Sequence, residues 1–210
     1  MAKQKAFYFN SNTCTGCKAC MAACKDKNDL PVGVNWRRVY EYGGGSWVPD
    51  PDNPGLFLPN NVFAYAVSVA CMHCQNAVCT DVCPANAFVK GPDGVVTLDQ
   101  DKCIGCRYCE WTCPYGAPQF LEDKGVMSKC DGCQDLVAAG EKPACVDACV
   151  MRALDFGDLS ELKAKYGGAD ALAPLPGGSY TSPAFIVTPH RHAQDSKMGT
   201  GHILGLPEEG

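Results

Sequence analysis

The sequence lacks a long hydrophobic run and lacks the pattern of an export signal. Its longest weakly polar stretch, residues 62–72, is far shorter than the roughly 20 apolar residues that a membrane-spanning helix needs. The two lysines near the start are not followed by an apolar segment, and Cys14 appears where a signal peptide would still be running. We therefore expect no direct membrane span and no cleavable leader.

Signals for nucleic-acid binding and for catalysis are also missing. The net charge is −5, and lysine and arginine are scattered singly apart from the pair Arg37 and Arg38, which argues against a nucleic-acid partner. There is no catalytic triad, phosphate loop or dinucleotide fingerprint, and the glycines of residues 43–45 are predicted to lie in a loop. The chain is therefore expected to bind no nucleic acid and to hold no catalytic site of its own.

Cysteine, in contrast, is abundant, with 16 residues among 210. This density is typical of small secreted domains that are held together by disulfides, but the chain is about twice too long for that class and can bury a core without them. Because no leader is expected either, a disulfide framework is disfavoured.

The cysteines fall into four groups of four with none left over. The first and third groups have the spacing C-x2-C-x2-C-x3-C, whereas the middle gap widens to four residues in the second group and to eleven in the fourth. In chain order the groups are Cys14, Cys17, Cys20 and Cys24; Cys71, Cys74, Cys79 and Cys83; Cys103, Cys106, Cys109 and Cys113; and Cys130, Cys133, Cys145 and Cys149. The sequence thus repeats one kind of site four times.

This spacing is typical of iron–sulfur ligation. Three cysteines on a tight loop can bind three irons of one cuboidal cluster, and in two-cluster ferredoxins the last cysteine, usually followed by proline, ligates the other cluster. Pro84 and Pro114 follow the second and third groups, whereas Lys25 and Val150 follow the first and fourth. Four [4Fe-4S] clusters would use every thiol in the chain.

Two other kinds of metal site fit less well. A closed zinc site uses two C-x2-C pairs separated by a longer loop, whereas here three cysteines fall within seven residues. A Rieske centre needs two histidines in place of two cysteines. The second group keeps all four cysteines, so His73 is predicted to be an ordinary polar neighbour.

The segments between the groups predict an α+β fold. Residues 61–70 and 94–99 read as short strands leading into cysteine loops, while the four prolines of residues 49–59 predict an irregular surface loop. Strands that enter cysteine loops, with short helices after them, are typical of ferredoxin-like modules.

The second and third groups are neighbours and predict one two-cluster module over residues 57–119. The first and fourth groups must then pair, so residues 1–56 with 120–157 form a second module that is interleaved with the first. Exchange of the last ligand predicts four sets: Cys14, Cys17, Cys20 and Cys149; Cys24, Cys130, Cys133 and Cys145; Cys71, Cys74, Cys79 and Cys113; and Cys83, Cys103, Cys106 and Cys109. The alternative is sequential ligation within each group.

Residues 158–210 form a C-terminal extension. Asp158 and Glu161 resemble a capping box that opens a short helix ending at residues 167–168. From Ala173 onward the chain is rich in proline and glycine, so we expect either disorder or an extended segment that docks on a partner. His190 and His192 have no cysteine nearby and are predicted to be exposed rather than ligands.

Five basic residues lie close in sequence to ligand cysteines, and their charge would stabilise the reduced, more negative cluster and raise its potential. The alternative for each is a solvated surface charge. They are Lys18, Lys25, Arg107, Lys129 and Arg152.

The intervening segments make the pattern more specific. The order and spacing of the groups, together with CTGCKAC, WRRVYEY, CIGCRYC followed by CPYGAPQ, KCDGC, RALDFG and APLP, closely resemble the iron–sulfur subunit of anaerobic dimethyl sulfoxide reductase over nearly the whole chain. Cys106 disfavours the respiratory nitrate reductase relative, in which a tryptophan takes this position. In the family, the first group pairs with the fourth and the second with the third.

The resemblance implies a non-catalytic electron-transfer subunit in a heterotrimer. A membrane anchor would oxidise menaquinol, and the four clusters would carry the electrons to a molybdopterin-containing catalytic subunit that reduces dimethyl sulfoxide or related S- or N-oxides in anaerobic respiration. The same chain could serve a polysulfide, tetrathionate or catechol-dehydroxylating molybdoenzyme, or act as a free polyferredoxin. Membrane association would be peripheral, through a partner, and co-export with a partner that carries a twin-arginine signal would place the chain on the periplasmic face.

Overall fold

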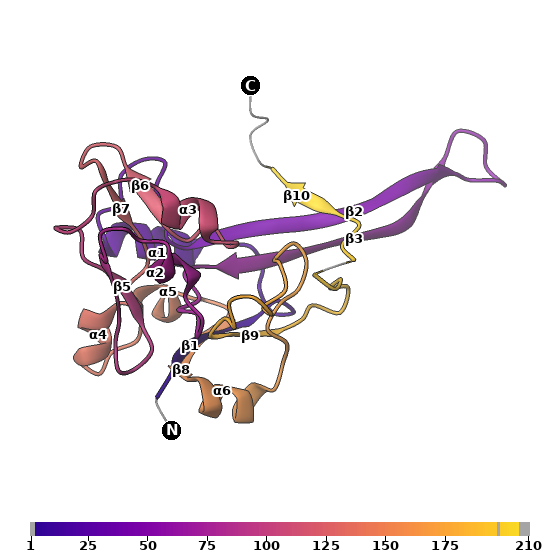
Figure 1. Ribbon diagram of the computed structural model, residues 1–210. Helices are drawn as coiled ribbons and strands as arrows, with labels where there is room; N and C mark the ends of the chain where they lie inside the picture. Colours follow the sequence, from indigo (N-terminus) through magenta and orange to yellow (C-terminus); the bar gives the residue numbers. More distant parts are fainter. Residues whose placement is uncertain (1–2, 197, 206–210) are drawn as a thin grey trace.

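The computed structural model describes residues 3–196 and 198–205, which form an α+β fold (Figure 1). The strands are β1 (Lys5–Asn10), β2 (Arg38–Pro49), β3 (Phe57–Val69), β4 (Phe88–Lys90), β5 (Val96–Leu98), β6 (Gln119–Leu121), β7 (Val126–Ser128), β8 (Leu154–Asp158), β9 (Phe185–Thr188) and β10 (His202–Leu204). The helices are α1 (Ala19–Lys27), α2 (Val78–Asp81), α3 (Tyr108–Thr112), α4 (Gln134–Ala138), α5 (Ala144–Asp147) and α6 (Leu159–Tyr166). Residues 197 and 206–210 of the predicted extension lie outside the described residues.

Strand β1 lies at the centre of a three-stranded sheet, antiparallel to β8 and parallel to β9. Its four middle residues are all buried, as expected for a strand that is covered on both faces. Phe7 and Phe9 belong to the main core, which contains many of the cysteines. Tyr8 packs on the other side with Leu162 of α6. The sheet therefore separates the cysteine-rich core from helix α6.

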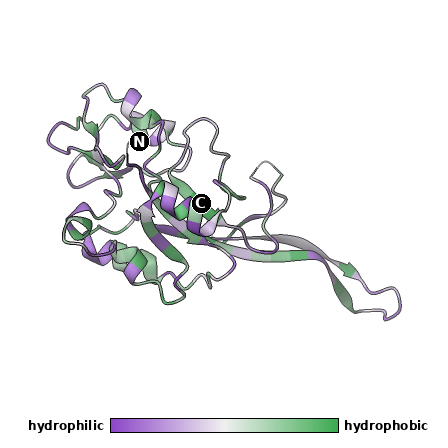
Figure 2. Cartoon of the chain, turned by 90° about the horizontal axis from the view of Figure 1, so that it is seen from below, coloured by the Kyte–Doolittle hydropathy of each residue, from purple (hydrophilic) through white to green (hydrophobic). Residues whose placement is uncertain are grey.

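Strands β2 and β3 form an antiparallel hairpin that projects far from the rest of the molecule (Figure 1). The register runs from Arg38 opposite Val69 to Pro49 opposite Phe57, with an irregularity between Gly44 and Ser46. The predicted loop over residues 43–45 is therefore wrong, because these glycines lie within β2. Near the body the hairpin is buried, whereas its outer part is exposed although it carries hydrophobic residues (Figure 2). Strand β10 pairs with β2, so β3 is an edge strand.

The prediction of an irregular loop over residues 49–59 is wrong at both ends. Pro49 ends β2, and Pro59 lies inside β3 opposite Trp47, so only residues 50–56 form the connection. Proline lacks an N–H for the ladder, but an edge strand tolerates this. The predicted strands over residues 61–70 and 94–99 are confirmed, with shifted ends, as parts of β3 and as β5.

The C-terminal extension contributes to the fold along much of its length. Strand β9 is almost completely buried against β1, and Leu175 is only 5% exposed, so the alternative of disorder is wrong for these residues. Helix α6 confirms the predicted helix and ends before Gly167. The capping box is wrong, because the Asp158 side chain makes no capping hydrogen bond and instead lies 3.2 Å from the Lys5 ammonium.

Over residues 3–196 and 198–205, none of the helices has the length and apolar character needed to cross a bilayer.

Candidate metal centres

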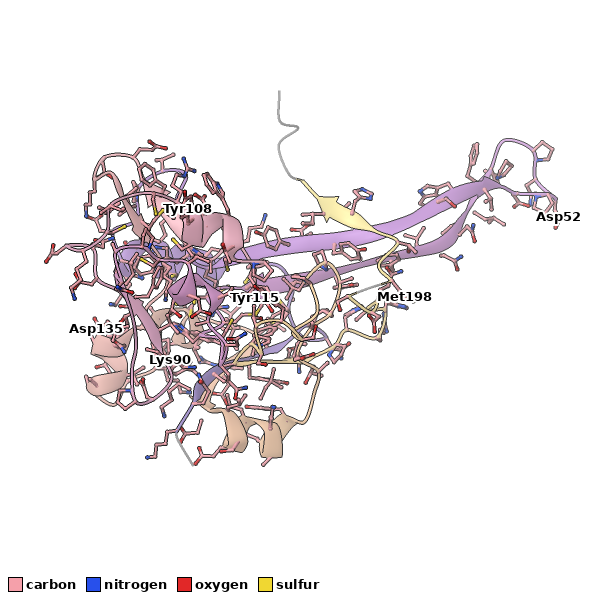
Figure 3. All side chains as sticks on the ribbon, viewed as in Figure 1. Asp52, Lys90, Tyr108, Tyr115, Asp135 and Met198 are labelled. Carbon is pink, nitrogen blue, oxygen red and sulfur yellow. The ribbon has the colours of Figure 1, made fainter. Side chains whose placement is uncertain are left out.

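All sixteen cysteines lie in the described part of the chain, and none of them forms a disulfide there. Sulfur atoms gather in the body of the molecule, away from Asp52 at the tip of the hairpin (Figure 3). In each group, the first cysteines lie on a loop and a later one lies in a short helix: Cys20 in α1, Cys79 in α2, Cys109 in α3 and Cys145 in α5. Helix α1 packs against α5 and α2 against α3, so the first group meets the fourth and the second meets the third.

Two of the predicted ligand sets each line one small cavity. Cys14, Cys17, Cys20 and Cys149, here called site 1, line a cavity with Phe9, Val39 and Leu154. Cys71, Cys74, Cys79 and Cys113, here called site 3, line another with Val78, Val96 and Tyr115. In both cavities the last cysteine comes from the partner group.

Within each of the other two sets, the thiols lie close enough to shift one another's pKa values. Site 2 consists of Cys24, Cys130, Cys133 and Cys145, all of them buried. Burial, followed by the neighbouring Cys145 and Cys133 thiols, raises the pKa of Cys24 to about 12. Site 4 consists of Cys83, Cys103, Cys106 and Cys109, where burial and then the other three thiols raise the pKa of Cys109 to about 11.

Left-handed backbone shapes the cysteine loops. The residue before the second cysteine has a positive φ in every group, and it is Gly16, Gly105 and Gly132 in three of them. In the second group this position is His73, with a φ of 42°. Glycine adopts this conformation without a steric penalty. The repeat seen in the spacing is therefore also a repeat of loop conformation.

A second repeated feature follows the last cysteine of each group. The backbone N–H groups of Ala87, Ala117 and Ala153 donate to the sulfur atoms four residues earlier, at 3.4, 3.5 and 3.2 Å. In the first group the side-chain amide of Asn28 takes this place, with Nδ2 3.7 Å from the Cys24 sulfur. Hydrogen bonds to sulfur stabilise a cluster ligand and tune its potential.

Val150 does not alter this arrangement, although the second and third groups have proline at the equivalent position. Arg152 has a φ of 51°, matching Asn86 and Gly116 at the same place after their cysteines. The N–H···S bond from Ala153 is also retained. Proline is thus dispensable for the backbone path after Cys149.

The donor set fits a cuboidal iron–sulfur cluster. Sites 1 and 3 surround small cavities lined otherwise by largely apolar residues, and N–H groups donate to their last cysteines. Within residues 3–196 and 198–205, no three cysteine, histidine, aspartate or glutamate side chains converge closely enough to share one metal ion. Thiols spread around a larger space match the separate irons of one cluster.

His73 is more than an ordinary polar neighbour. It is 1% exposed, and its Nδ1 accepts a hydrogen bond of 3.1 Å from the Val96 N–H. Its ring lies between sites 3 and 2, with Nδ1 4.0 Å from the Cys71 sulfur and Nε2 3.9 Å from the Cys130 sulfur. The sequence carries one sign of this role, because His73 takes the position that glycine takes in the other three groups.

Among the five predicted basic residues, Lys129 is the buried one, at 4% exposure. Its ammonium donates to the carbonyls of Val96 and Cys130. Burial raises the pKa of the Cys71 thiol, but His73 and Lys129 lower it to about 5. The four other basic side chains are bound at or near the surface by carboxylates or carbonyls: Lys18, Lys25, Arg107 and Arg152.

His190 and His192 of the C-terminal extension lie apart from the cysteine sets. His192 is exposed, as predicted, whereas His190 is half-buried and stacks on Tyr65 with ring centroids 5.8 Å apart. No sequence pattern indicates this contact, because Tyr65 lies 125 residues earlier in the chain.

Comparison with known proteins agrees with the cysteine pattern. The family described as 4Fe-4S dicluster domain matches residues 62–159, and the family described as 4Fe-4S binding domain matches residues 11–33. The B subunit of anaerobic dimethyl sulfoxide reductase from Escherichia coli is 49% identical over 99% of this chain and 100% of its own length. The subunit of the same name from Haemophilus influenzae is 49% identical over 99% of both chains.

A more distant relative carries a different name. The B subunit of polysulfide reductase from Wolinella succinogenes is 35% identical over 91% of this chain and 97% of its own length. The higher identity lies with the dimethyl sulfoxide reductase proteins, and it extends over the full length. The protein therefore belongs to the family of anaerobic dimethyl sulfoxide reductase B subunits and carries their 4Fe-4S domains.

Proposed function

We propose that the chain is an electron-transfer subunit that holds four [4Fe-4S] clusters, one in each of sites 1 to 4. The observation that carries the proposal is the gathering of cysteines from paired groups, seen in the cavities of sites 1 and 3. Each cluster, when bound, supplies a centre that gains and loses one electron. The chain's own residues fix the clusters in place, exclude water and set their potentials.

The contacts between sites support a linear path for electrons. Besides burial, the Cys145 thiol of site 2 raises the pKa of Cys20 in site 1, and the Cys71 thiol of site 3 raises the pKa of Cys130 in site 2. The His73 ring lies between Cys71 and Cys130. Sites 3 and 4 are built from the same two groups. The order of the path is therefore 1, 2, 3, 4, in one direction or the other.

The two-module arrangement belongs to the same proposal. Helix packing supports a module of residues 57–119 and a second of residues 1–56 with 120–157. The boundary at residues 56 and 57 falls at the tip of the β2–β3 hairpin, so the two strands join the modules by hydrogen bonds. Residues 158–210 would dock on a partner through side chains that stay exposed, such as Tyr180 and Met198.

The names of the relatives, each the B chain of a reductase, support a place in a reductase of several subunits. In the proposal, which follows the family resemblance, a membrane anchor with a quinol site delivers electrons, and a molybdopterin-containing subunit reduces dimethyl sulfoxide or related S- or N-oxides. Catalysis would occur in that partner, and this chain would be a peripheral, non-catalytic subunit. Co-export with a partner that carries a twin-arginine signal would place it on the periplasmic face.

Iron and acid-labile sulfide analysis tests the cluster count. We expect about sixteen irons and as many sulfides per full-length chain isolated without oxygen. A count near eight would contradict two of the four sites, and zinc in place of iron would contradict the whole proposal.

Purification from membranes tests the assembly: molybdenum should copurify with the chain, and a monodisperse iron–sulfur protein without it would indicate a free polyferredoxin.

A further inference from the structure

Arg37 is the largest of the fully buried side chains, at 1% exposure. Its Nη1 donates a 3.2 Å hydrogen bond to the Ser68 hydroxyl, and its guanidinium carbon lies 4.7 Å from the centre of the Phe7 ring. Its Nε and Nη2 groups have no hydrogen-bond partner among the described residues, and no carboxylate there lies within ion-pair distance. A buried cation without a counter-charge is strongly unfavourable, so an anion must lie close to it.

The groups around Arg37 identify that anion. Burial lowers the pKa of the Arg37 guanidinium, but neighbouring thiols raise it above its usual value: Cys145 of site 2, Cys20 of site 1, and then Cys130 and Cys24 of site 2. The Ser68 hydroxyl that holds the guanidinium also lies 3.5 Å from the Cys20 sulfur. The backbone N–H of Arg37 also donates to the Cys24 thiol of site 2, so the residue lies beside both sites.

We infer that Arg37 is the shared counter-charge of the clusters in sites 1 and 2, holding both in place and raising both of their potentials. A cluster with four thiolates is an anion, and reduction adds one more negative charge. A cation fixed beside it in a region that excludes water favours the reduced state more strongly than a solvated cation can. The inference rests on the ligand sets proposed above and assigns a role to a residue outside all four.

The other basic residues differ from Arg37 in ways that supply controls. Arg38, the next residue, donates from Nη2 to the Tyr115 carbonyl at 2.7 Å, and its charge acts on Cys113 of site 3. Lys18 lies beside Cys17 of site 1, but its side chain is 56% exposed and lies 3.8 Å from Glu41. Replacing Arg38 thus tests whether the effect on the potential is specific to the nearby site. Replacing Lys18 tests whether an exposed charge beside site 1 has as large an effect as a buried one.

A redox titration followed by EPR, on the full-length chain with its clusters assembled in the cell, measures the effect. In Arg37→Gln, two of the four one-electron steps should shift so that the ratio of reduced to oxidised cluster falls at least tenfold at a given potential. This corresponds to about 59 mV. Arg37→Lys keeps the charge, so both potentials should stay close to those of the wild-type protein.

The controls should respond differently. Arg38→Gln should shift a different step, and Lys18→Gln should shift its step much less than Arg37→Gln does. Unchanged potentials in an iron-replete Arg37→Gln protein would overturn the inference, as would an equal shift of all four steps or an Arg37→Lys protein that behaves like Arg37→Gln.

Iron analysis separates this result from the proposed function. If Arg37→Gln loses iron while Arg37→Lys keeps the wild-type content and potentials, the charge is required and the inference stands. If both variants lose iron, Arg37 has a purely structural role and the inference fails. The wild-type iron count tests the four sites independently of either outcome.

Discussion

The last cysteine of each group distinguishes exchanged from sequential ligation. Cys149 lines the cavity of site 1, although its neighbours in sequence belong to site 2. We expect Cys149→Ser and Cys17→Ser to alter the same cluster, because both remove a ligand of site 1. Iron should fall from about sixteen to between about twelve and fifteen per chain in each variant, and the two EPR spectra should lack the same signal.

Cys133→Ser provides the comparison, since Cys133 and Cys149 belong to the same group in sequence. Under exchange of the last ligand, its spectrum should lack a different signal from that lost in Cys149→Ser. A shared missing signal in Cys133→Ser and Cys149→Ser would favour sequential ligation instead.

Two loop glycines with the same backbone conformation differ in the space around them. Gly16 and Gly105 both have a φ of +69°. A Cβ on Gly16 would lie 3.6 Å or more from its neighbours, whereas one on Gly105 would collide with the Gly125 carbonyl oxygen. Gly16→Ala should therefore cost only about 1 kcal/mol of backbone strain and keep its iron. Gly105→Ala should displace the site 4 loop and lose about four irons; equal iron contents in the two variants would contradict this.

The residues around the clusters show what the sequence reveals about a site. Cysteine spacing alone predicts which residues bind metal, because each ligand loop is local. Arg37 and Ser68 have no such signal, because they approach the cysteines only through the pairing of β2 with β3. Their roles depend on the tertiary structure, which the spacing of short motifs does not record.

Strand β9 makes the C-terminal extension part of the body rather than an appendage. Its removal should destabilise the protein, because fully burying a large apolar side chain contributes about 2 kcal/mol. Four such side chains, Leu172, Phe185, Ile186 and Val187, then sum to about 8 kcal/mol, comparable with the ~5–15 kcal/mol stability of a typical domain. A chain ending at Gly168 should aggregate or lose its clusters.

A chain ending at Ser196 is the matched control. It loses β10, which among the described strands pairs with β2 alone and is largely exposed. This chain should keep its full iron content and unfold at nearly the wild-type temperature. Iron-replete, soluble protein from both truncations would show that residues 169–196 are dispensable for the fold.

The success of sequence-based prediction differs between elements for a physical reason. Helix α6 and strand β5 are local, and turn residues mark their ends, so their existence could be predicted. Strand β9 is short and flanked by Pro183 and Pro189, and its partner β1 lies almost at the other end of the chain. A local pattern cannot reveal such a pairing, and the same holds for the contact between β10 and β2.

At the scale of the whole molecule, the four sites are unequally shielded from solvent. All four cysteines of site 2 are buried, whereas site 1 includes the exposed Cys17 and site 4 has only Cys109 buried. Site 2 is also enclosed by the packing of α1 against α5 and by the buried Arg37. Site 2, the second in the proposed electron path, is therefore the best shielded of the four sites.

This shielding predicts the order in which the clusters are lost. Under a mild oxidant with an iron chelator, the site 4 cluster should be lost early and the site 2 cluster last, because oxidant, water and chelator must reach the sulfurs. Iron release should then proceed in stages, and EPR samples taken during the reaction, assigned with Cys133→Ser, should retain the site 2 signal longest. Release in a single phase, or early loss of the site 2 signal, would contradict the idea that burial of the ligands controls cluster stability.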